Sequence, residues 1–166
     1  MIVMKFGVEM DADSREPDLG MLIGQMGRAL QDELFSRLAE QGHPQVQPRH
    51  GTVLAVLPAS GARATELAQR SGQHKQIVGT IVDELERLGY VRREADPSDR
   101  RAKLVVPTET GLDEVDKGRA ILAQIEQRHR QELGSEVYRV FMTALEHVTR
   151  SQRAWRQLSD VPADGG

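Results

Sequence analysis

Apolar residues recur at steps of three and four along most of this chain, which is the spacing of one face of an α-helix. The first stripe predicts a long amphipathic helix over about 18–42, with members Leu22, Ile23, Met26, Leu30, Leu34 and Leu38. Two more stripes predict helices over about 110–132 and 135–157, broken near Gly134; their members are Val115, Leu122, Ile125 and Leu133, then Val137, Phe141, Leu145, Val148 and Trp155. Long helices are therefore expected towards both ends of the chain.

Shorter elements are predicted between these helices. Pro48 suits the first turn of a short helix, because its missing N–H would have no partner there in any case, and a second short helix is expected over 65–70. Ser71 and Gly72 form a turn in which Ser71 is a candidate cap for a third helix, over about 73–88. The half of that helix predicted to be apolar consists of Ile77, Val78, Ile81, Val82, Leu85 and Leu88.

Two short segments with β-branched residues follow, at 90–93 and 103–106. They predict two strands joined by the polar loop EADPSDRRA. Three short helices followed by a β-hairpin form a winged helix-turn-helix. The expected fold class is therefore mainly α with a small β-hairpin wing, in which the winged helix-turn-helix is flanked by N- and C-terminal dimerisation helices.

The predicted organisation is one domain over 18–158, between a flexible arm at 1–17 and a frayed tail at 159–166. Its winged helix-turn-helix covers about 47–109, and its dimerisation helices cover about 18–42 and 110–157. The stripes on the terminal helices are too extensive for one thin domain to cover, so a two-fold homodimer is expected.

Composition excludes several classes of protein. The 166 residues include no cysteine, so neither a disulfide nor a thiolate metal site is expected. Without a signal peptide or an apolar run of the roughly 20 residues that a membrane span requires, we expect a cytoplasmic protein with no membrane partner. The five histidines lack the spacing of a helical chelate, so no metal or other cofactor is expected. No phosphate loop, nucleophile elbow or carboxylate pair is evident, so no catalytic residue is assigned and an enzyme is not expected.

Charge alone does not indicate a nucleic-acid partner, because the net charge is −3. Its distribution is more informative: residues 62–111 contain nine Lys and Arg against eight Asp and Glu, giving +1 and leaving −4 for the rest. A winged helix that associates with protein and not with DNA is therefore the alternative function.

The polar half of the third helix has chemistry suited to double-stranded DNA. A major groove about 12 Å wide admits an α-helix and presents a distinct donor and acceptor pattern for each base pair. Amides and a hydroxyl suit base edges, an ammonium suits phosphate or guanine, and a glycine allows close approach. The candidate residues are Gln73, His74, Lys75, Gln76, Gly79 and Thr80. An exposed helix face is the alternative for this group, and a helix-end or packing role is the alternative for His74.

The predicted hairpin carries a second cationic group at its tip, formed by Arg100, Arg101 and Lys103. Long cations suit the narrow minor groove, where the negative potential is enhanced. A solvated loop is the alternative, since exposed turns are often charged. The two groups together predict a DNA-binding surface.

The segment from TELAQRSG to PTETG resembles the MarR (multiple antibiotic resistance regulator) family. It contains LERLGYVRR at 85–93, the wing sequence DPSDRRAK at 96–103, and Thr108 three residues before Gly111. With the flanking helices, the resemblance covers roughly 18–158. The family pattern of Ser or Thr, any residue, Thr and Arg is absent from the recognition helix, which has Gln76, Gly79 and Thr80 instead.

The resemblance implies an obligate homodimer that binds a pseudo-palindromic operator and regulates transcription, with repression expected. In the wing, Asp99 matches the acid that braces an arginine, and Arg101 matches the arginine of the same pattern. Many relatives sense a small aromatic or phenolic effector between the DNA-binding lobe and the dimer helices. Arg28, Arg49 and His50 border that region here and could hold a carboxylate. Contacts between helices are the alternative for these three, and the more usual role of such residues.

Overall fold

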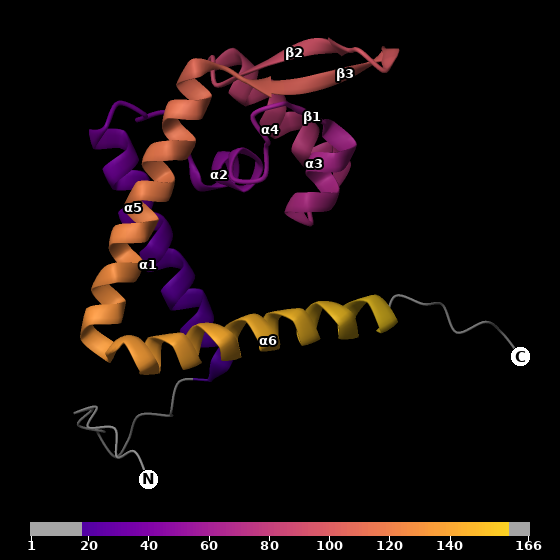
Figure 1. Ribbon diagram of the computed structural model, residues 1–166. Coiled ribbons are helices and arrows are strands. Elements are labelled where there is room, and N and C mark those ends of the chain that lie inside the picture. Colours follow the sequence, from indigo (N-terminus) through magenta and orange to yellow (C-terminus); the bar gives the residue numbers. More distant parts are fainter. Residues whose placement is uncertain (1–17, 160–166) are drawn as a thin grey trace, which may run out of the picture.

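The computed structural model describes residues 18–159, except the side chains of residues 100 and 156–159. The arm at 1–17, most of the expected tail and the Arg100 side chain lie outside the described residues. Figure 1 shows the described elements: α1 (Leu19–Glu40), α2 (Pro48–Leu54), β1 (Ala62–Arg63), α3 (Ala64–Ser71), α4 (Lys75–Arg87), β2 (Val91–Asp96), β3 (Asp99–Pro107), α5 (Glu109–Leu133) and α6 (Ser135–Ser159). The mainly α fold with a small β wing is confirmed.

The middle of the chain forms a head with its own core. Helices α2, α3 and α4 gather beneath the β-hairpin, and α4 packs against both other helices and against β2. The residues at the centre of this core are almost completely buried: Val53, Leu54, Leu67, Val78, Val82, Leu85 and Val105. Since these come from α2, α3, α4 and β3, the position of each of these elements depends on the others.

The wing is longer than predicted. Strands β2 and β3 are antiparallel, with Val91 opposite Pro107 and Ala95 opposite Lys103, and the register shifts at Asp96. The prediction of a long loop EADPSDRRA is wrong, because both strands extend into it and leave residues 97–98 as the turn. The two-residue strand β1 on the outer edge of β3 was not predicted, because a segment this short has no alternating pattern to detect.

Helix α5 is joined to the head by a close backbone contact. A Cβ atom built on Gly111 would lie 2.1 Å from the carbonyl oxygen of Tyr90, so no other residue fits at this point without movement of the backbone. Thr108 caps α5 by accepting from the Gly111 N–H at 3.2 Å, and its hydroxyl donates to the carbonyl of Gly89 at 2.6 Å. This contact fixes the start of the long helix relative to the wing.

Helices α1 and α5 cross through a small separate core of Leu38, Ile121 and Ile125. Arg128 of α5 reinforces the crossing by donating from Nη1 and Nη2 to the two carboxylate oxygens of Glu33, at 3.1 and 2.6 Å. The stripe predicted for α5 is wrong at Leu122, which is 39% exposed, while Ile121 is buried in its place. Adjacent positions on a helix differ by 100°, so a stripe read from spacing alone can be displaced by one residue.

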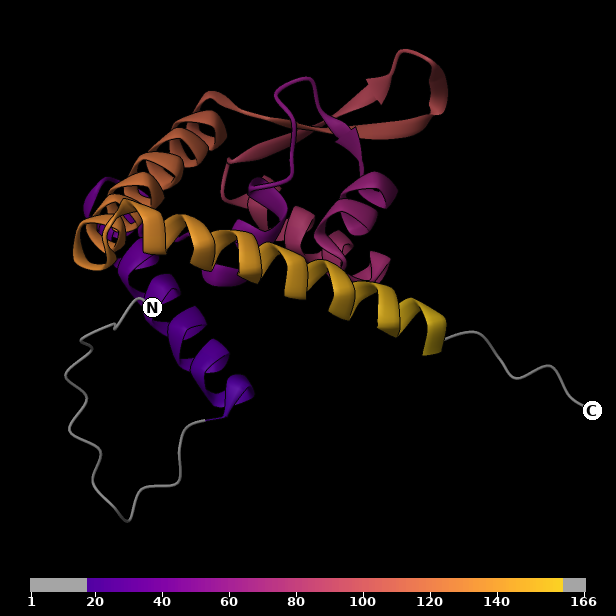
Figure 2. The ribbon, with the colours of Figure 1, turned by 60° about the horizontal axis from the view of Figure 1, so that its bottom comes forward.

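Apolar side chains stay uncovered on α1 and α6. In Figures 1 and 2, α6 extends from the end of α5 as a rod, and among the described elements its extensive contact is with α5. The exposed apolar residues of the two helices are Leu19, Met21, Leu22, Ile23 and Met26, then Val140, Phe141, Met142, Leu145, Val148 and Trp155. One copy of the chain therefore leaves apolar surface exposed on both helices.

A partly buried polar cluster lies where α5 meets the head, with His43, Tyr90 and Glu114 as its buried members. His43 lies 3.1 Å through Nδ1 from the Tyr90 hydroxyl and 3.0 Å through Nε2 from the Asp113 carboxylate, which Lys117 also contacts. Glu114 is 4% exposed, and burial raises the pKa of its carboxyl to about 7. The neutral acid is therefore the form that this site favours.

We predict that Glu114→Gln changes the pH dependence of stability. Folded wild-type protein holds the Glu114 proton more tightly than unfolded protein, whose carboxyl has a pKa near 4.5. The free energy of unfolding should therefore fall as pH rises from about 4.5 to about 7, by up to about 3 kcal/mol, and then level off. The variant should lack this decline in urea titrations across pH 4–8. Glu126→Gln, exposed on the same helix, is the control, and a variant with the wild-type decline contradicts the prediction.

Candidate nucleic-acid interface

Helix α4 has one buried and one exposed face, as predicted for a recognition helix, with one exception. Val78, Ile81, Val82 and Leu85 are at most 3% exposed and face the head core. On the other face, the side chains of Lys75, Gln76 and Thr80 are exposed, and Gly79 is partly exposed. The prediction that Ile77 belongs to the buried half is wrong, because 50% of that residue is exposed.

The start of α4 also differs from the prediction. Ser71 does not cap it: Ser71 is the last residue of α3, and Gly72 ends that helix in the left-handed conformation at φ 68°. Helix α4 begins at Lys75, with His74 at the N-cap position and no hydrogen bond from its side chain. Gln73 and His74 thus lie in the turn before α4, where His74 is exposed and has the helix-end position.

Polar contacts with α2 hold α4 in place. Buried His50 accepts the Gln47 backbone N–H at Nδ1, at 3.1 Å, and its Nε2 lies 2.9 Å from the Glu84 carboxylate. Because Nδ1 accepts, Nε2 is the ring nitrogen that donates to Glu84. The hydrogen bond from His50 and then the charge of Arg49, whose Nε is 3.0 Å away, lower the pKa of Glu84. Gln73 adds a contact, donating from Nε2 to the Thr52 hydroxyl at 2.9 Å.

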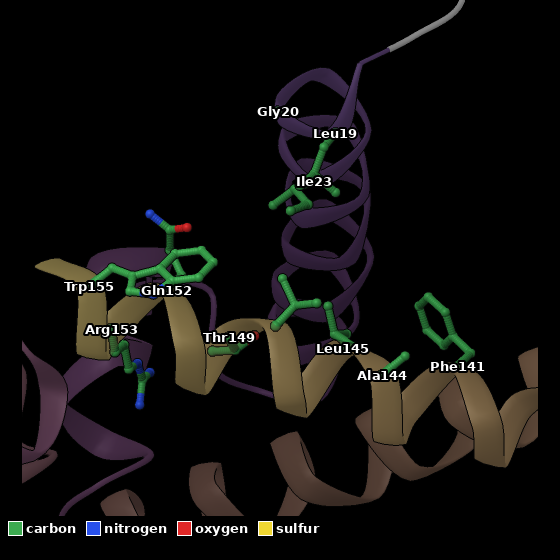
Figure 3. Close-up of a pocket in the computed structure, with 11 residues that line it drawn as sticks. Leu19, Gly20, Ile23, Phe141, Ala144, Leu145, Thr149, Gln152, Arg153 and Trp155 are labelled. Atoms are coloured by element: carbon green, nitrogen blue, oxygen red, sulfur yellow. The ribbon is translucent and has the colours of Figure 1, made fainter.

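The three residues predicted to border an effector site are not assembled into one. His50 and Arg49 meet at Glu84 inside the head, which is the interhelical role. Arg28 is exposed on α1, and no hydrogen bond or ion pair joins it to the other two among the described residues. The cavity in Figure 3 lies elsewhere, between the start of α1 and α6, and is lined by apolar side chains such as Ile23, Phe141 and Leu145.

The wing is anchored to β1 by a carboxylate that sequence reasoning missed. Asp96 is 5% exposed and accepts from Arg63 Nε at 2.7 Å, and from the N–H and hydroxyl of Ser98 at 2.8 and 2.6 Å. These bonds, first from Ser98 and then from Arg63, lower the pKa of Asp96 to about 2. An Asp-Pro-Ser sequence at a predicted turn was the available signal, because Asp often accepts the N–H two residues on.

Asp99, the residue predicted to brace an arginine, lies further out. Its carboxylate is 3.8 Å from Arg63 Nη2 and accepts the backbone N–H of Arg101 at 3.1 Å. Arg101 and Lys103 are exposed, and no ion pair engages either side chain within the part of the chain that the structure describes. Arg93, nearer the base of the hairpin, is instead held by Asp83 and Glu86 of α4. The unpaired cations of the wing are therefore towards its tip.

Two other kinds of site are not found in the described residues. Over 18–159, no helix combines the length and apolarity needed to cross a membrane. The same residues contain no group of three His, Asp or Glu side chains arranged to hold a metal ion.

Comparison with known proteins agrees with this arrangement. Residues 45–102 match the model of the MarR family. A segment of 44 residues, 26% of this chain, is 48% identical to the uncharacterized HTH-type transcriptional regulator YcgE of Bacillus subtilis (strain 168). That segment spans 29% of the length of YcgE.

Solved structures extend the similarity to most of the chain. CouR from Rhodococcus jostii RHA1, in a crystal structure with p-coumaroyl-CoA, is 27% identical with a TM-score of 0.65, over 82% of this chain and 95% of CouR. The transcriptional repressor CouR bound to a 23-mer DNA duplex aligns with a TM-score of 0.68 at 23% identity, over 86% of this chain and 99% of the other. The DNA-bound CouR structure supports the assignment of the fold of this chain.

We predict that Asp96→Asn loosens the wing more than Asp99→Asn does. The pKa of Asp96 in the folded protein lies below the usual 3.8, so its charge stabilises the fold above about pH 4, and this contribution is lost as pH falls towards 2. Asp96→Asn should lower the thermal unfolding midpoint by several degrees at pH 7, and the difference from wild type should shrink towards pH 2. Asp99→Asn, at the more distant contact, should have a smaller effect; equal effects would contradict the assignment of Asp96.

Proposed function

We propose that this chain, whose winged helix-turn-helix matches the MarR family model over residues 45–102, is a homodimeric repressor that binds a palindromic DNA operator. The observation that carries the proposal is the exposure of polar and cationic side chains on one face of α4 and of cations towards the wing tip. YcgE and CouR are named as a transcriptional regulator and a transcriptional repressor, and we propose that this chain is likewise a regulator and not an enzyme. A regulator acts where the DNA is, so the proposed location is the cytoplasm.

In the proposed complex, α4 enters the major groove and the hairpin tip reaches the adjacent minor groove. Gln76 and Thr80 would contact base edges, and Lys75 would contact phosphate or guanine. The wing cations would neutralise phosphates and add affinity for any sequence. The full proposed contact set is Gln73, His74, Lys75, Gln76, Gly79, Thr80, Arg100, Arg101 and Lys103, with Asp99 ordering the backbone that carries Arg101.

The uncovered apolar residues of α1 and α6 support the homodimer. Contiguous apolar surface on a folded protein is normally buried against a partner, and a two-fold partner uses the same surface on both copies. Two-fold symmetry would place the paired α4 helices about 34 Å apart, one turn of DNA, which is why a palindromic operator is proposed.

We propose that a small aromatic or phenolic effector releases the operator. The similar protein CouR is bound to p-coumaroyl-CoA, whose acyl group is phenolic, and this supports the proposal. The effector would stabilise a separation of the two heads that cannot reach successive grooves. Arg28 is the exposed cation of the three predicted effector residues, whereas a ligand at Arg49 or His50 would have to displace their contacts with Glu84.

One observation favours a second function, association with protein. The net charge of −3 is unusual for a DNA reader. Selection of duplex fragments with purified protein, followed by gel shifts at increasing salt, separates the two functions. A DNA reader should recover a palindrome and lose affinity by orders of magnitude between 50 and 200 mM salt. A protein bound to no duplex at low salt would overturn the proposed function.

We predict opposite kinds of defect in Arg101→Ala and Gln76→Ala. Loss of a wing cation should weaken binding to operator and unrelated DNA alike, and reduce the salt slope by about one. Loss of the Gln76 amide should reduce discrimination at one base pair, by about 1–3 kcal/mol. Binding curves on the operator and its single-base variants measure both.

Arg92→Ala is the matched control for the wing, because Arg92 is on the same hairpin but is paired with Glu94. It should bind like wild type. The assignment of the wing fails if Arg101→Ala retains wild-type affinity, and that of Gln76 fails if its variant keeps the wild-type base preference.

We predict that Gly79→Ala stabilises the fold but weakens DNA binding. A Cβ at Gly79 meets nothing within 4 Å, and alanine in a helix interior is favoured over glycine by about 1 kcal/mol. In the groove, the same methyl would occupy space next to the bases. Thermal unfolding and gel shifts test both effects. Gly118→Ala, equally open on α5, should raise stability alone; unchanged DNA affinity in Gly79→Ala would argue against close approach there.

A further inference from the structure

Ile77 differs from the other apolar residues of α4 because it is exposed. The large apolar side chains found exposed in the described residues belong to α1, α5 and α6, with the exception of Ile77 on α4. Half of Ile77 is exposed, whereas its neighbour Val78 is completely buried. The exposed apolar surface of the long helices has an expected partner in a second copy of the chain, and Ile77 has none within the head.

The surroundings of Ile77 indicate what would cover it. It lies in the first turn of α4, next to exposed Gln76 and three residues before exposed Thr80, at the edge of the polar face. A recognition helix contacts base edges mainly through its N-terminal residues. Ile77 is therefore among the residues of α4 that would come closest to the bases.

We propose that Ile77 covers the C5-methyl group of a thymine at one position of each operator half-site. The thymine methyl is the apolar group that an unmodified major groove presents, and apolar side chains discriminate thymine through it. A β-branched side chain on a helix has one preferred χ1 rotamer, so Ile77 loses little conformational freedom on contact. The inference rests on the proposed DNA binding and adds to it an apolar determinant of base preference.

The test is a uracil scan of the operator selected by the wild-type protein. Each thymine in a half-site is replaced in turn by deoxyuridine, which removes the methyl and leaves base pairing unchanged. At one position in the bases contacted by α4, wild type should bind about fourfold more weakly per half-site, the equivalent of about 0.8 kcal/mol for one buried methyl group. Ile77→Ala should lose this difference, and Ile77→Val should keep most of it.

Other outcomes separate the two proposals. Operator binding that is insensitive to every replacement overturns this inference and leaves the DNA-binding function standing. The same follows if Ile77→Ala, shown by circular dichroism to be folded, retains the wild-type penalty. A wild-type protein that binds no duplex overturns both, and Ile77 would then belong to a protein interface. Gly118→Ala on α5 serves as the control, since it should show the wild-type uracil profile.

Discussion

Burial of one side of α4 is the constraint on which the proposed function depends. Val78, Ile81, Val82 and Leu85 are almost fully enclosed by α2, α3 and the hairpin, and each such side chain contributes roughly 1.5–3 kcal/mol when removed from water. That burial fixes the rotation of the helix about its axis. The polar face of α4, and Ile77 with it, is exposed because the core leaves no other orientation.

Carboxylates explain why an acidic chain can present a cationic surface. Glu84 holds His50 and Arg49, and Asp96 holds Arg63, so these acids are used inside the head to orient its elements. Hydrogen bonds from His50 to Glu84 and from Ser98 to Asp96, and then the neighbouring Arg49 and Arg63, lower the pKa of the two acids. The cations of Lys75, Arg101 and Lys103 have no such partner among the described residues, which makes net charge a poor guide to the local field.

The long helices bury less apolar surface within one copy of the chain than the head does. The crossing of α1 and α5 is held by a small apolar core and by the pair of Arg128 and Glu33, whereas α6 leaves its apolar residues exposed. The close contact of Gly111 with Tyr90 joins this scaffold to the wing. A change in how two copies associate would therefore be transmitted to the heads through α5, which is the physical basis of the proposed release by an effector.

Periodicity was enough to predict α1, α4, α5 and α6, because a helix that covers a core must repeat its apolar positions. The same reasoning could not decide positions at the edge of a stripe. Ile77 and Leu122 were expected inside and are exposed, since a shift of one residue turns a side chain by 100° and only packing selects between the two. The N-cap of α4 and the strand β1 were also beyond prediction, because a short segment has too few residues to show a period. The burial of Asp96 depended on Arg63, which is 33 residues away in the chain. Sequence by itself determined which elements form and which chemistry they carry; the tertiary structure decided which side chains face solvent, because that depends on neighbours that are distant in sequence.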